Sequence, residues 1–173
     1  MRGGISIIIS KPNELEINQL FEVIQECKQD LINQGIHQWG HVYPDKDVIR
    51  GDISNQSIFT LRVDGEIAGI ISLDKDDCKE YQTINWNYKG DQFAVVHRLC
   101  VRPKYQGRGI GLKLMQFIHE ACKQELIKSV RLDVYSGNDN AIEFYKKLGY
   151  QIRGEVFFPR RNLPFLCMEK EIL

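Results

Sequence analysis

The sequence carries no excess of charge of either sign and contains no long apolar run. Lysine and arginine together number 23, as do aspartate and glutamate, so the formal net charge over 173 residues is zero. Nothing approaches the roughly 18 uninterrupted apolar residues of a membrane span, and the apolar run at residues 5–9 is too short for a signal-peptide core. We therefore expect no nucleic-acid partner, no membrane partner and a cytoplasmic location.

Cysteine is scarce and lacks the spacing of a structural site. The five cysteines are odd in number and widely separated, and no two of them form a C-x-x-C pair: Cys27, Cys78, Cys100, Cys122 and Cys167. Neither a disulfide framework nor a zinc site is indicated, and we expect no bound metal. Cys100 and Cys122 are predicted to be small apolar packing residues.

Linkers, internal repeats and low-complexity tracts are absent too, so residues 1–173 are expected to form one domain. Apolar periodicity predicts the order β, α, α, β, β, β, α, β, α, β, β, a mixed α/β class with helices on both faces of a sheet. Asn13, with Glu16 three residues later, predicts a capping box at the start of the first helix, and Asp64-Gly65 predicts a two-residue type I′ hairpin. The polar segment 74–90 is predicted to be a surface excursion. The predicted strands are 5–10, 57–63, 66–73, 93–101, 130–134, 150–158 and 164–171, and the helices begin after Asn13, near Lys46, near Leu112 and at Ala141.

A cluster of glycines lies between the strand predicted at 93–101 and the helix that follows it. The loop reads Gln106-Gly107-Arg108-Gly109-Ile110-Gly111. Glycine permits positive φ and close backbone approach, and a helix N-terminus offers unpaired N–H groups and a positive dipole end. The combination predicts a cradle for a phosphate.

Spacing separates three kinds of phosphate loop. A Walker A loop requires G-x-x-x-x-G-K-[S/T], and no Lys-Ser or Lys-Thr follows such a glycine pair here. A dinucleotide loop requires G-x-G-x-x-G, but Leu112 stands where the third glycine belongs. The third pattern, R/Q-x-x-G-x-G/A, is met by Gln106, Gly109 and Gly111.

With this third pattern the sequence resembles the GNAT superfamily of acyl-CoA-dependent N-acetyltransferases. Residues 138–150 are similar to the family's second block, N-x-x-A-x-x-x-Y-x-x-x-G-[FY], with Asn138, Ala141, Tyr145, Gly149 and Tyr150 at the defining positions. The resemblance implies a central, mostly antiparallel, twisted sheet of about seven strands, with a parallel pair at the cofactor site and helices on both faces.

The resemblance also implies which residues bind acetyl-CoA as co-substrate. The main chain of the strand before the loop receives the pantetheine arm, and the loop N–H groups receive the pyrophosphate. Arg108 either adds charge to the phosphates or is simply solvated, and Asn138 caps its helix and reaches the cofactor. The implied cofactor-binding set is Leu99, Cys100, Val101, Gln106, Gly107, Arg108, Gly109, Ile110, Gly111, Asn138 and Tyr145.

Three side chains are candidates for the acid and the base. Tyr145 has the chemistry to protonate or hydrogen-bond the departing thiolate, although an aromatic residue on an amphipathic helix is also an ordinary core residue. Asp133 stands where some family members carry a catalytic Glu, and His97 is a second candidate base. Either one also fits the role of a hydrogen-bonded structural residue, and positioning alone accelerates attack on an activated thioester.

The acceptor groove of the family is formed by the first helices and the last hairpin. Here this points to His37, Trp39, Tyr43, Trp86 and the segment 157–161, which includes Arg160 and Arg161, and we take Trp39, Tyr43 and Arg160 as the substrate-binding candidates. Aromatic rings beside arginine suit an amine with a nearby carboxylate, such as an amino acid or a peptide end. The acceptor stays open among small amines, amino acids, a protein N-terminus and a lysine side chain. The same aromatics are equally suited to a core or to the contacts of a homodimer. Two other functions stay open: an acyl-CoA sensor without turnover, and a dinucleotide-binding protein.

Overall fold

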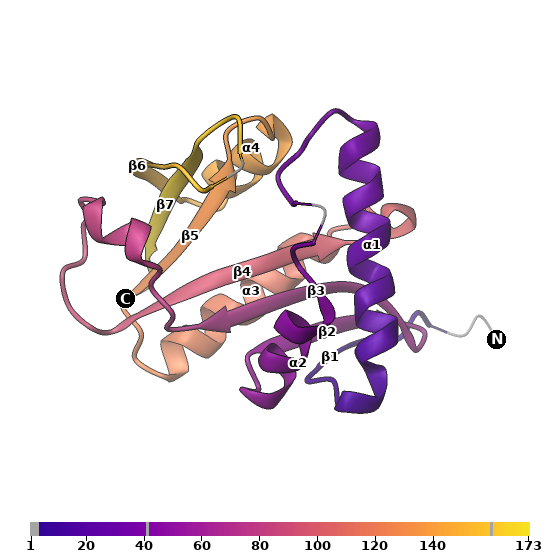
Figure 1. Cartoon of the computed structure of the whole chain (residues 1–173). Helices are drawn as coiled ribbons and strands as arrows, with labels where there is room; N and C mark the ends of the chain where they lie inside the picture. The colour runs from indigo at the N-terminus through magenta and orange to yellow at the C-terminus, as the bar shows by residue number, and fades with distance from the viewer. Residues whose placement is uncertain (1–3, 41, 160) are drawn as a thin grey trace.

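The computed structural model describes residues 4–40, 42–159 and 161–173. Among these residues a seven-stranded sheet is flanked by α-helices (Figure 1), in the predicted order of elements. Three short 3-10 turns, η1 (Glu14–Glu16), η2 (Lys79–Thr83) and η3 (Pro103–Tyr105), join some of them. The strands and helices are β1 (Ile7–Ser10), α1 (Ile17–Asn33), α2 (Lys46–Ser54), β2 (Ile58–Val63), β3 (Glu66–Asp74), β4 (Phe93–Val101), α3 (Ile110–Gln124), β5 (Ser129–Tyr135), α4 (Asp139–Lys147), β6 (Gln151–Val156) and β7 (Phe165–Glu171).

The sheet is mostly antiparallel, with one parallel pair. Its strand order is β1-β2-β3-β4-β5-β7-β6, and β4 and β5 run parallel while the other neighbours run antiparallel. The expected mixed α/β class is therefore confirmed, and so is the expected parallel pair. A dinucleotide loop belongs to a doubly wound parallel sheet, and the described residues do not form one.

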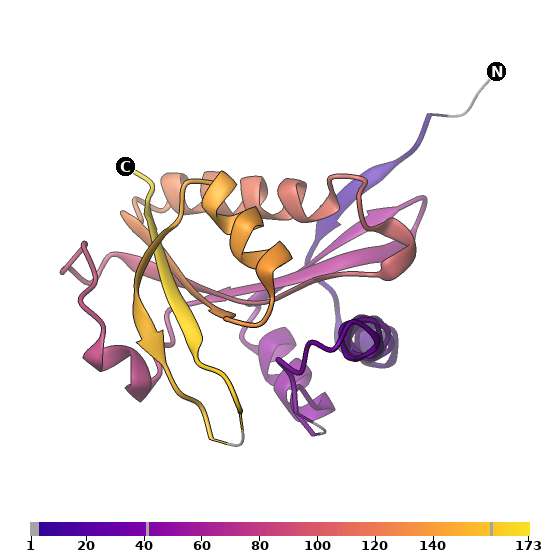
Figure 2. The same cartoon turned by 90° about the horizontal axis from the view of Figure 1, so that it is seen from above.

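Helices cover both faces of the sheet, as Figure 2 shows: α3 and α4 lie on one face, and α1 and α2 on the other. Leu114 and Ile118 of α3 and Ile142 of α4 pack with Leu132 of β5 in the core of the first face. The second face is filled from α1 and α2, whose apolar stripes pack on β3 and β4 through Leu20, Val23, Ile24, Ile49, Ile53, Ile70 and Cys100. No helix within the described residues is long and apolar enough to cross a membrane.

Local sequence signals account for several of these elements. Asn13 and Glu16 form the predicted capping box, because the Asn13 side chain accepts from the backbone while Glu16 accepts from the Asn13 N–H at 2.9 Å. Asp64 and Gly65 both have positive φ (49° and 86°), as a type I′ turn between β2 and β3 requires. Helix α3 begins at Ile110, two residues before the predicted start at Leu112, because Gly109 already acts as its N-cap.

The prediction of a surface excursion over residues 74–90 is wrong in part. This segment contains η2, and Tyr81 and Trp86 are 1% and 6% exposed, so both are core residues. The two rings pack together at 5.3 Å between centroids. They join Val95, Tyr135 and Phe165 in a third apolar cluster, between this segment and the C-terminal part of the sheet.

Candidate active site

The strands β4 and β5 pair only at their first residues and then separate. Their parallel register covers Phe93 to Val95 against Ser129 to Arg131, and beyond it the two strands diverge (Figure 1). On its other side β4 remains paired with β3, with an irregularity opposite Ile70 to Ser72, where Arg98 has a φ of 52°. A cavity of about 600 Å³ occupies the region of divergence and is lined by residues 96–101 of β4 and 133–135 of β5. We call this region the fork.

Two candidate bases lie where the fork opens. His97 and Asp133 each stand two residues beyond the last paired positions, Val95 and Arg131, so strand alternation places both side chains on the same face of the sheet. Both line the cavity. His97 Nε2 lies 3.0 Å from Oδ1 of Asp74, and Tyr81 donates its hydroxyl to Oδ2 of Asp133 at 2.5 Å.

The environment of Asp133 makes its ionised form less stable than it would be in water. Burial raises the pKa of Asp133 above its ordinary value, and the Tyr81 hydrogen bond and the charge of His97 only partly offset this effect. A carboxylate whose pKa is raised toward neutrality is better matched to accepting a proton from an ammonium group. The position and the environment of Asp133 are therefore compatible with a general base.

Tyr145 reaches the same cavity from the opposite side of the sheet. It lies on α4, is 8% exposed and packs in the core that α3 shares, whereas Asp133 points toward the face that carries Tyr81. Burial, and after it the negative charge of Asp133, raises the pKa of the Tyr145 phenol well above its ordinary value. Its hydroxyl therefore stays protonated and available as a donor inside the cavity.

The glycine loop follows directly from the free end of β4. Leu99, Cys100, Val101 and Gln106 line the cavity, whereas the residues from 107 to 111 form the turn into α3 beyond it. Gly107 and Gly109 have φ of 72° and 75°, and a Cβ at either position would meet no atom within 4 Å. This open space surrounds the backbone that we expect to face a phosphate.

The start of α3 supplies N–H groups outside the helical ladder. The first bond of the helix runs from the Lys113 N–H to the Gly109 carbonyl, so the N–H groups just before Lys113 have no place in it. The Arg108 guanidinium lies over the Tyr105 ring at 5.6 Å. Gln106 turns away from the loop, since its side chain donates to Asp30 and to the Val101 carbonyl, both at 3.2 Å.

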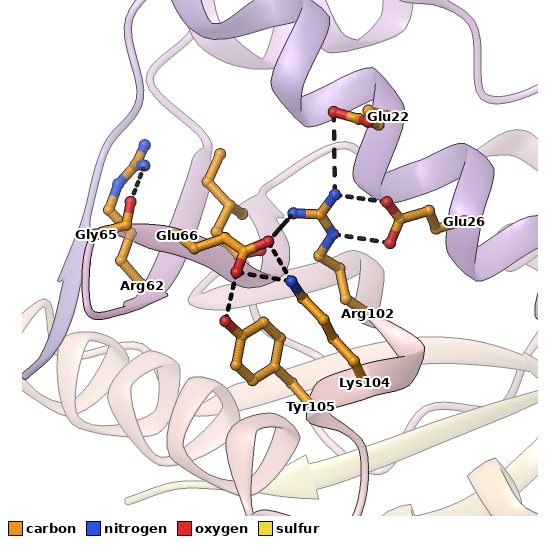
Figure 3. Close-up of polar contacts among 9 residues, drawn as sticks. Glu22, Glu26, Arg62, Gly65, Glu66, Arg102, Lys104 and Tyr105 are labelled. Atoms are coloured by element: carbon orange, nitrogen blue, oxygen red, sulfur yellow. Dashed lines mark hydrogen bonds and ion pairs between the residues drawn. The ribbon is translucent and has the colours of Figure 1, made fainter. Parts of the chain in front are cut away.

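A network of ion pairs fixes the chain just before the loop (Figure 3). Arg102 donates to Glu26 of α1 at 2.8 and 2.5 Å and to Glu66 at the start of β3 at 2.8 Å. Lys104 and Tyr105 also donate to Glu66, at 2.8 and 2.6 Å. These two bonds lower the pKa of Glu66 below its ordinary value, and the bond from Lys104 has the larger effect. The network thus joins α1, β3 and η3 immediately before the glycines.

Asn138 links the second motif to the loop that follows α1. Its side chain accepts from the Ala141 N–H at 3.1 Å, which caps α4 as predicted, and its amide donates to Gln38 at 2.8 Å. The Gln38 carbonyl in turn accepts from Arg161 Nε at 3.2 Å. Residues from the α1–α2 loop, the start of α4 and the β6–β7 loop therefore meet beside the cavity.

The expected acceptor residues separate into three groups. Trp39 and Tyr43 line the cavity, whereas Trp86 lies in the core beneath Arg131, whose guanidinium is 4.5 Å from its ring centroid. Arg160 lies outside the described residues. Arg161, from the same expected segment, lines the cavity. Arg98, Gln38 and Tyr81 line it as well, although the sequence did not indicate them.

Arg98 also holds the acceptor side of the fork together. It makes two 2.7 Å bonds to Asp52 of α2 and donates to the Tyr43 hydroxyl at 3.0 Å, while Ser72 donates to the same carboxylate at 2.8 Å. The only sequence signal for this arrangement was the position of Arg98 next to His97 on a strand already assigned to the site.

The comparisons with known proteins agree with this geometry. The sequence model of the acetyltransferase (GNAT) family matches residues 17–150, well over half of the chain. An uncharacterised N-acetyltransferase, YesJ of Bacillus subtilis strain 168, is 26% identical over 127 residues, which are 72% of this chain and 70% of that protein.

Solved structures show the same fold. A GNAT-family acetyltransferase of Streptococcus agalactiae superposes with a TM-score of 0.84 at 24% identity, over 95% of each chain. The PaiA N-acetyltransferase of Thermoplasma acidophilum, solved in complex with coenzyme A, superposes with a TM-score of 0.70 at 22% identity, over 96% of this chain and 99% of that one. Motifs, fold and family match together show that this chain belongs to the GNAT family of acetyltransferases, enzymes that use acetyl-CoA.

Proposed function

We propose that this chain transfers the acetyl group of acetyl-CoA to a primary amine by direct attack of the amine on the thioester. One observation carries the proposal: Tyr145 and Asp133 reach a single cavity from opposite faces of the sheet, at the point where β4 and β5 separate. A thioester held at the fork would have a hydrogen-bond donor on one side and a proton acceptor on the other.

The residues around the fork fit acetyl-CoA. Beyond Val95, β4 has no partner strand on its β5 side among the described residues, so Leu99, Cys100 and Val101 present a strand edge to the pantetheine amides. The strand edge leads to Gly107 and Gly109 and to the start of α3, where N–H groups and the helix dipole suit the pyrophosphate. Asn138, at the start of α4, lies beside the same cavity.

The chain's own groups would then divide the reaction between them. Asp133 takes a proton from the incoming ammonium, directly or through His97, and the freed amine nitrogen attacks the thioester carbonyl carbon. As the carbon–sulfur bond breaks, the Tyr145 hydroxyl donates a hydrogen bond to the developing thiolate. The proton that the attacking nitrogen still carries passes to that sulfur, so the products are the N-acetyl amide and the free thiol of coenzyme A. The fork holds the two reactants in line.

The lining of the cavity favours an acceptor that carries one amine, a carboxylate and an apolar group. Asp133 is the single carboxylate among the described lining residues, whereas two arginines, Arg98 and Arg161, line the same cavity. The Arg98 guanidinium is paired with Asp52, so Arg161 is the group that we propose meets an acceptor carboxylate. A polyamine would carry several positive charges to a site with one carboxylate. Besides Tyr145, six aromatic side chains supply the apolar surface: Trp39, Tyr43, Tyr81, Tyr135, Phe158 and Phe165.

A panel of amines tests the function and the acceptor class together. With acetyl-CoA and free-thiol release as the readout, we expect apolar and aromatic α-amino acids to give a higher kcat/KM than their own amides by about 10-fold or more, since a guanidinium–carboxylate bond contributes about 1.5–3 kcal/mol. The same amino acids should also give a higher kcat/KM than spermidine.

The outcomes of this panel are separable. Equal rates for an amino acid and its amide, or a preference for spermidine, would contradict the acceptor class while leaving amine acetylation in place. Binding of acetyl-CoA without thiol release for any amine would instead favour the sensor.

A further inference from the structure

Tyr81 lies outside both family motifs, yet its hydroxyl is in direct contact with the candidate base. The residue belongs to η2, in the long connection between β3 and β4, and is 1% exposed. Its Oη donates to Oδ2 of Asp133 at 2.5 Å. Because a hydrogen bond to a carboxylate stabilises its charged form, this contact bears on when Asp133 is ready to accept a proton.

The backbone around Tyr81 is fixed by its own partner, Trp86. The indole Nε1 donates to the Tyr81 carbonyl at 3.2 Å, and the two rings pack at 5.3 Å. Arg131 lies over the Trp86 ring at 4.5 Å and over the Phe93 ring at 3.9 Å, measured from its guanidinium carbon to the ring centroids. Tyr81 is thereby held against β4 and β5, the two strands of the fork.

A buried carboxylate holds the other end of the same connection. Glu169 of β7 is 1% exposed and accepts from the N–H groups of Asn87 and Tyr88 at 2.7 and 3.3 Å, and from the Ser129 hydroxyl at 2.7 Å. Arg131 also donates to the Tyr88 carbonyl at 3.0 Å. Glu169 is buried and its carboxylate accepts hydrogen bonds from the backbone of this connection. These bonds hold the connection in a fixed position over the sheet.

Other ionisable groups face Asp133 from each element packed around it. His97 of β4 lowers the pKa of Asp133, and the negative charge of Asp133 raises the pKa of Tyr145 on α4. Cys78, just before η2, and Cys167 of β7 also face Asp133. Burial is the main cause that raises the pKa of both thiols, and the negative charge of Asp133 raises it further. Within the part of the chain that the structure describes, none of these groups hydrogen-bonds to the Asp133 carboxylate, whereas Tyr81 does.

We infer that Tyr81 is a positioning residue for the base: its hydroxyl fixes the Asp133 carboxylate at the fork and keeps it ionised at the pH of turnover. The inference rests on the proposed function, since it takes Asp133 as the base. The connection between β3 and β4 is then part of the active site, and its buried anchors on β5 and β7 set the geometry of proton removal.

The test compares Tyr81→Phe with Tyr88→Phe. The first substitution removes only the hydroxyl and keeps the ring against Trp86, and the second removes a hydroxyl of the same connection that lies 3.5 Å from Gln92. Two quantities are measured: the pKa of the Asp133 carboxyl by carbon-13 NMR without substrates, and the pH dependence of kcat/KM.

For Tyr81→Phe we expect the pKa of Asp133 to rise by about one unit and the acidic limb of kcat/KM to move up by the same amount, because one unit is a tenfold change in the ratio of the two protonation states. At pH values below the acidic limb, kcat/KM of the variant should be about 10-fold lower than that of the unmodified protein. At higher pH the two kcat/KM values should converge. Tyr88→Phe should match the unmodified protein in both measurements.

The two measurements separate the ways in which the inference can fail. An unchanged Asp133 pKa in Tyr81→Phe, in a protein that still turns over, overturns the role of Tyr81 alone. A raised Asp133 pKa with an unmoved acidic limb shows that Asp133 is not the base and overturns the inference through that step. Absence of amine-dependent turnover in the unmodified protein contradicts the proposed function itself.

Discussion

Replacing Tyr145 by phenylalanine is expected to lower kcat by about 100-fold or more while changing the dissociation constant of acetyl-CoA by less than about threefold. The ring would still fill its place in the core beside α3, and only the hydroxyl at the fork would be lost. Since the hydroxyl acts on charge that develops at sulfur during the reaction, its loss should appear in kcat and not in binding.

The environment of Tyr145 also indicates how its hydroxyl acts. Burial raises the pKa of the phenol well above its ordinary value, whereas a thiol has a pKa of about 8.5. Complete transfer of the proton from Tyr145 to the thiolate would therefore be uphill. We expect Tyr145 to stabilise the departing thiolate by a hydrogen bond, with the proton balance set by the amine and the base.

Tyr150→Phe is the matched control for Tyr145→Phe. Tyr150 is a second buried tyrosine, its ring lies 5.8 Å from that of Tyr145, and its hydroxyl bonds to His119 at 2.9 Å outside the cavity lining. Loss of its hydroxyl should affect stability more than turnover. Unchanged kcat in Tyr145→Phe, or an equal loss in both variants, would contradict the catalytic role of Tyr145.

Gly109→Asp is expected to weaken acetyl-CoA binding by about 30-fold or more, with the loss growing as ionic strength falls. Gly109 caps α3 with a φ of 75°, and its surroundings leave a side chain open space. An aspartate there would place a negative charge where we expect the pyrophosphate, and two like charges a few ångströms apart repel by several kcal/mol at a protein surface. Calorimetric titration with acetyl-CoA at two salt concentrations measures the effect.

Two controls separate charge from backbone strain in this experiment. Gly109→Asn has nearly the same shape and a similar tolerance of positive φ, but no charge, so its affinity should fall by only about threefold. Gly35→Asp adds the same charge at another glycine of positive φ, after the C-terminus of α1, and should leave affinity unchanged. Equal affinity for Gly109→Asp and the unmodified protein would remove the glycine loop from the cofactor site.

The sequence was sufficient for the elements whose signals are local. β4 was predicted with its observed limits, Phe93 to Val101, because the run is mostly apolar and strand-like and Pro103 follows closely. The hairpin at Asp64 and the cap at Asn13 depend on a few adjacent residues and were also confirmed. The glycine loop was found from its glycine spacing, and the Asn138 block from its resemblance to the family's second motif.

The remaining features depend on partners far away in the chain. The segment that contains Tyr81 and Trp86 was predicted to lie at the surface because it is polar, and Trp86 was also expected near the acceptor groove. The burial of both rings depends on Arg131 and Glu169, which belong to other strands. The positive φ of Arg98 is in turn stabilised by Asp52, 46 residues earlier. A pattern read within a short window of sequence contains no trace of such pairings.

The most direct test of the account is a crystal structure of this protein with coenzyme A bound. We expect the pantetheine arm to lie in the fork along Leu99 to Val101, the pyrophosphate to contact the N–H groups from 107 to 111, and the sulfur to lie within hydrogen-bond reach, about 3–4 Å, of the Tyr145 hydroxyl. Coenzyme A bound elsewhere on the sheet, or with its sulfur remote from both Tyr145 and Asp133, would contradict the account.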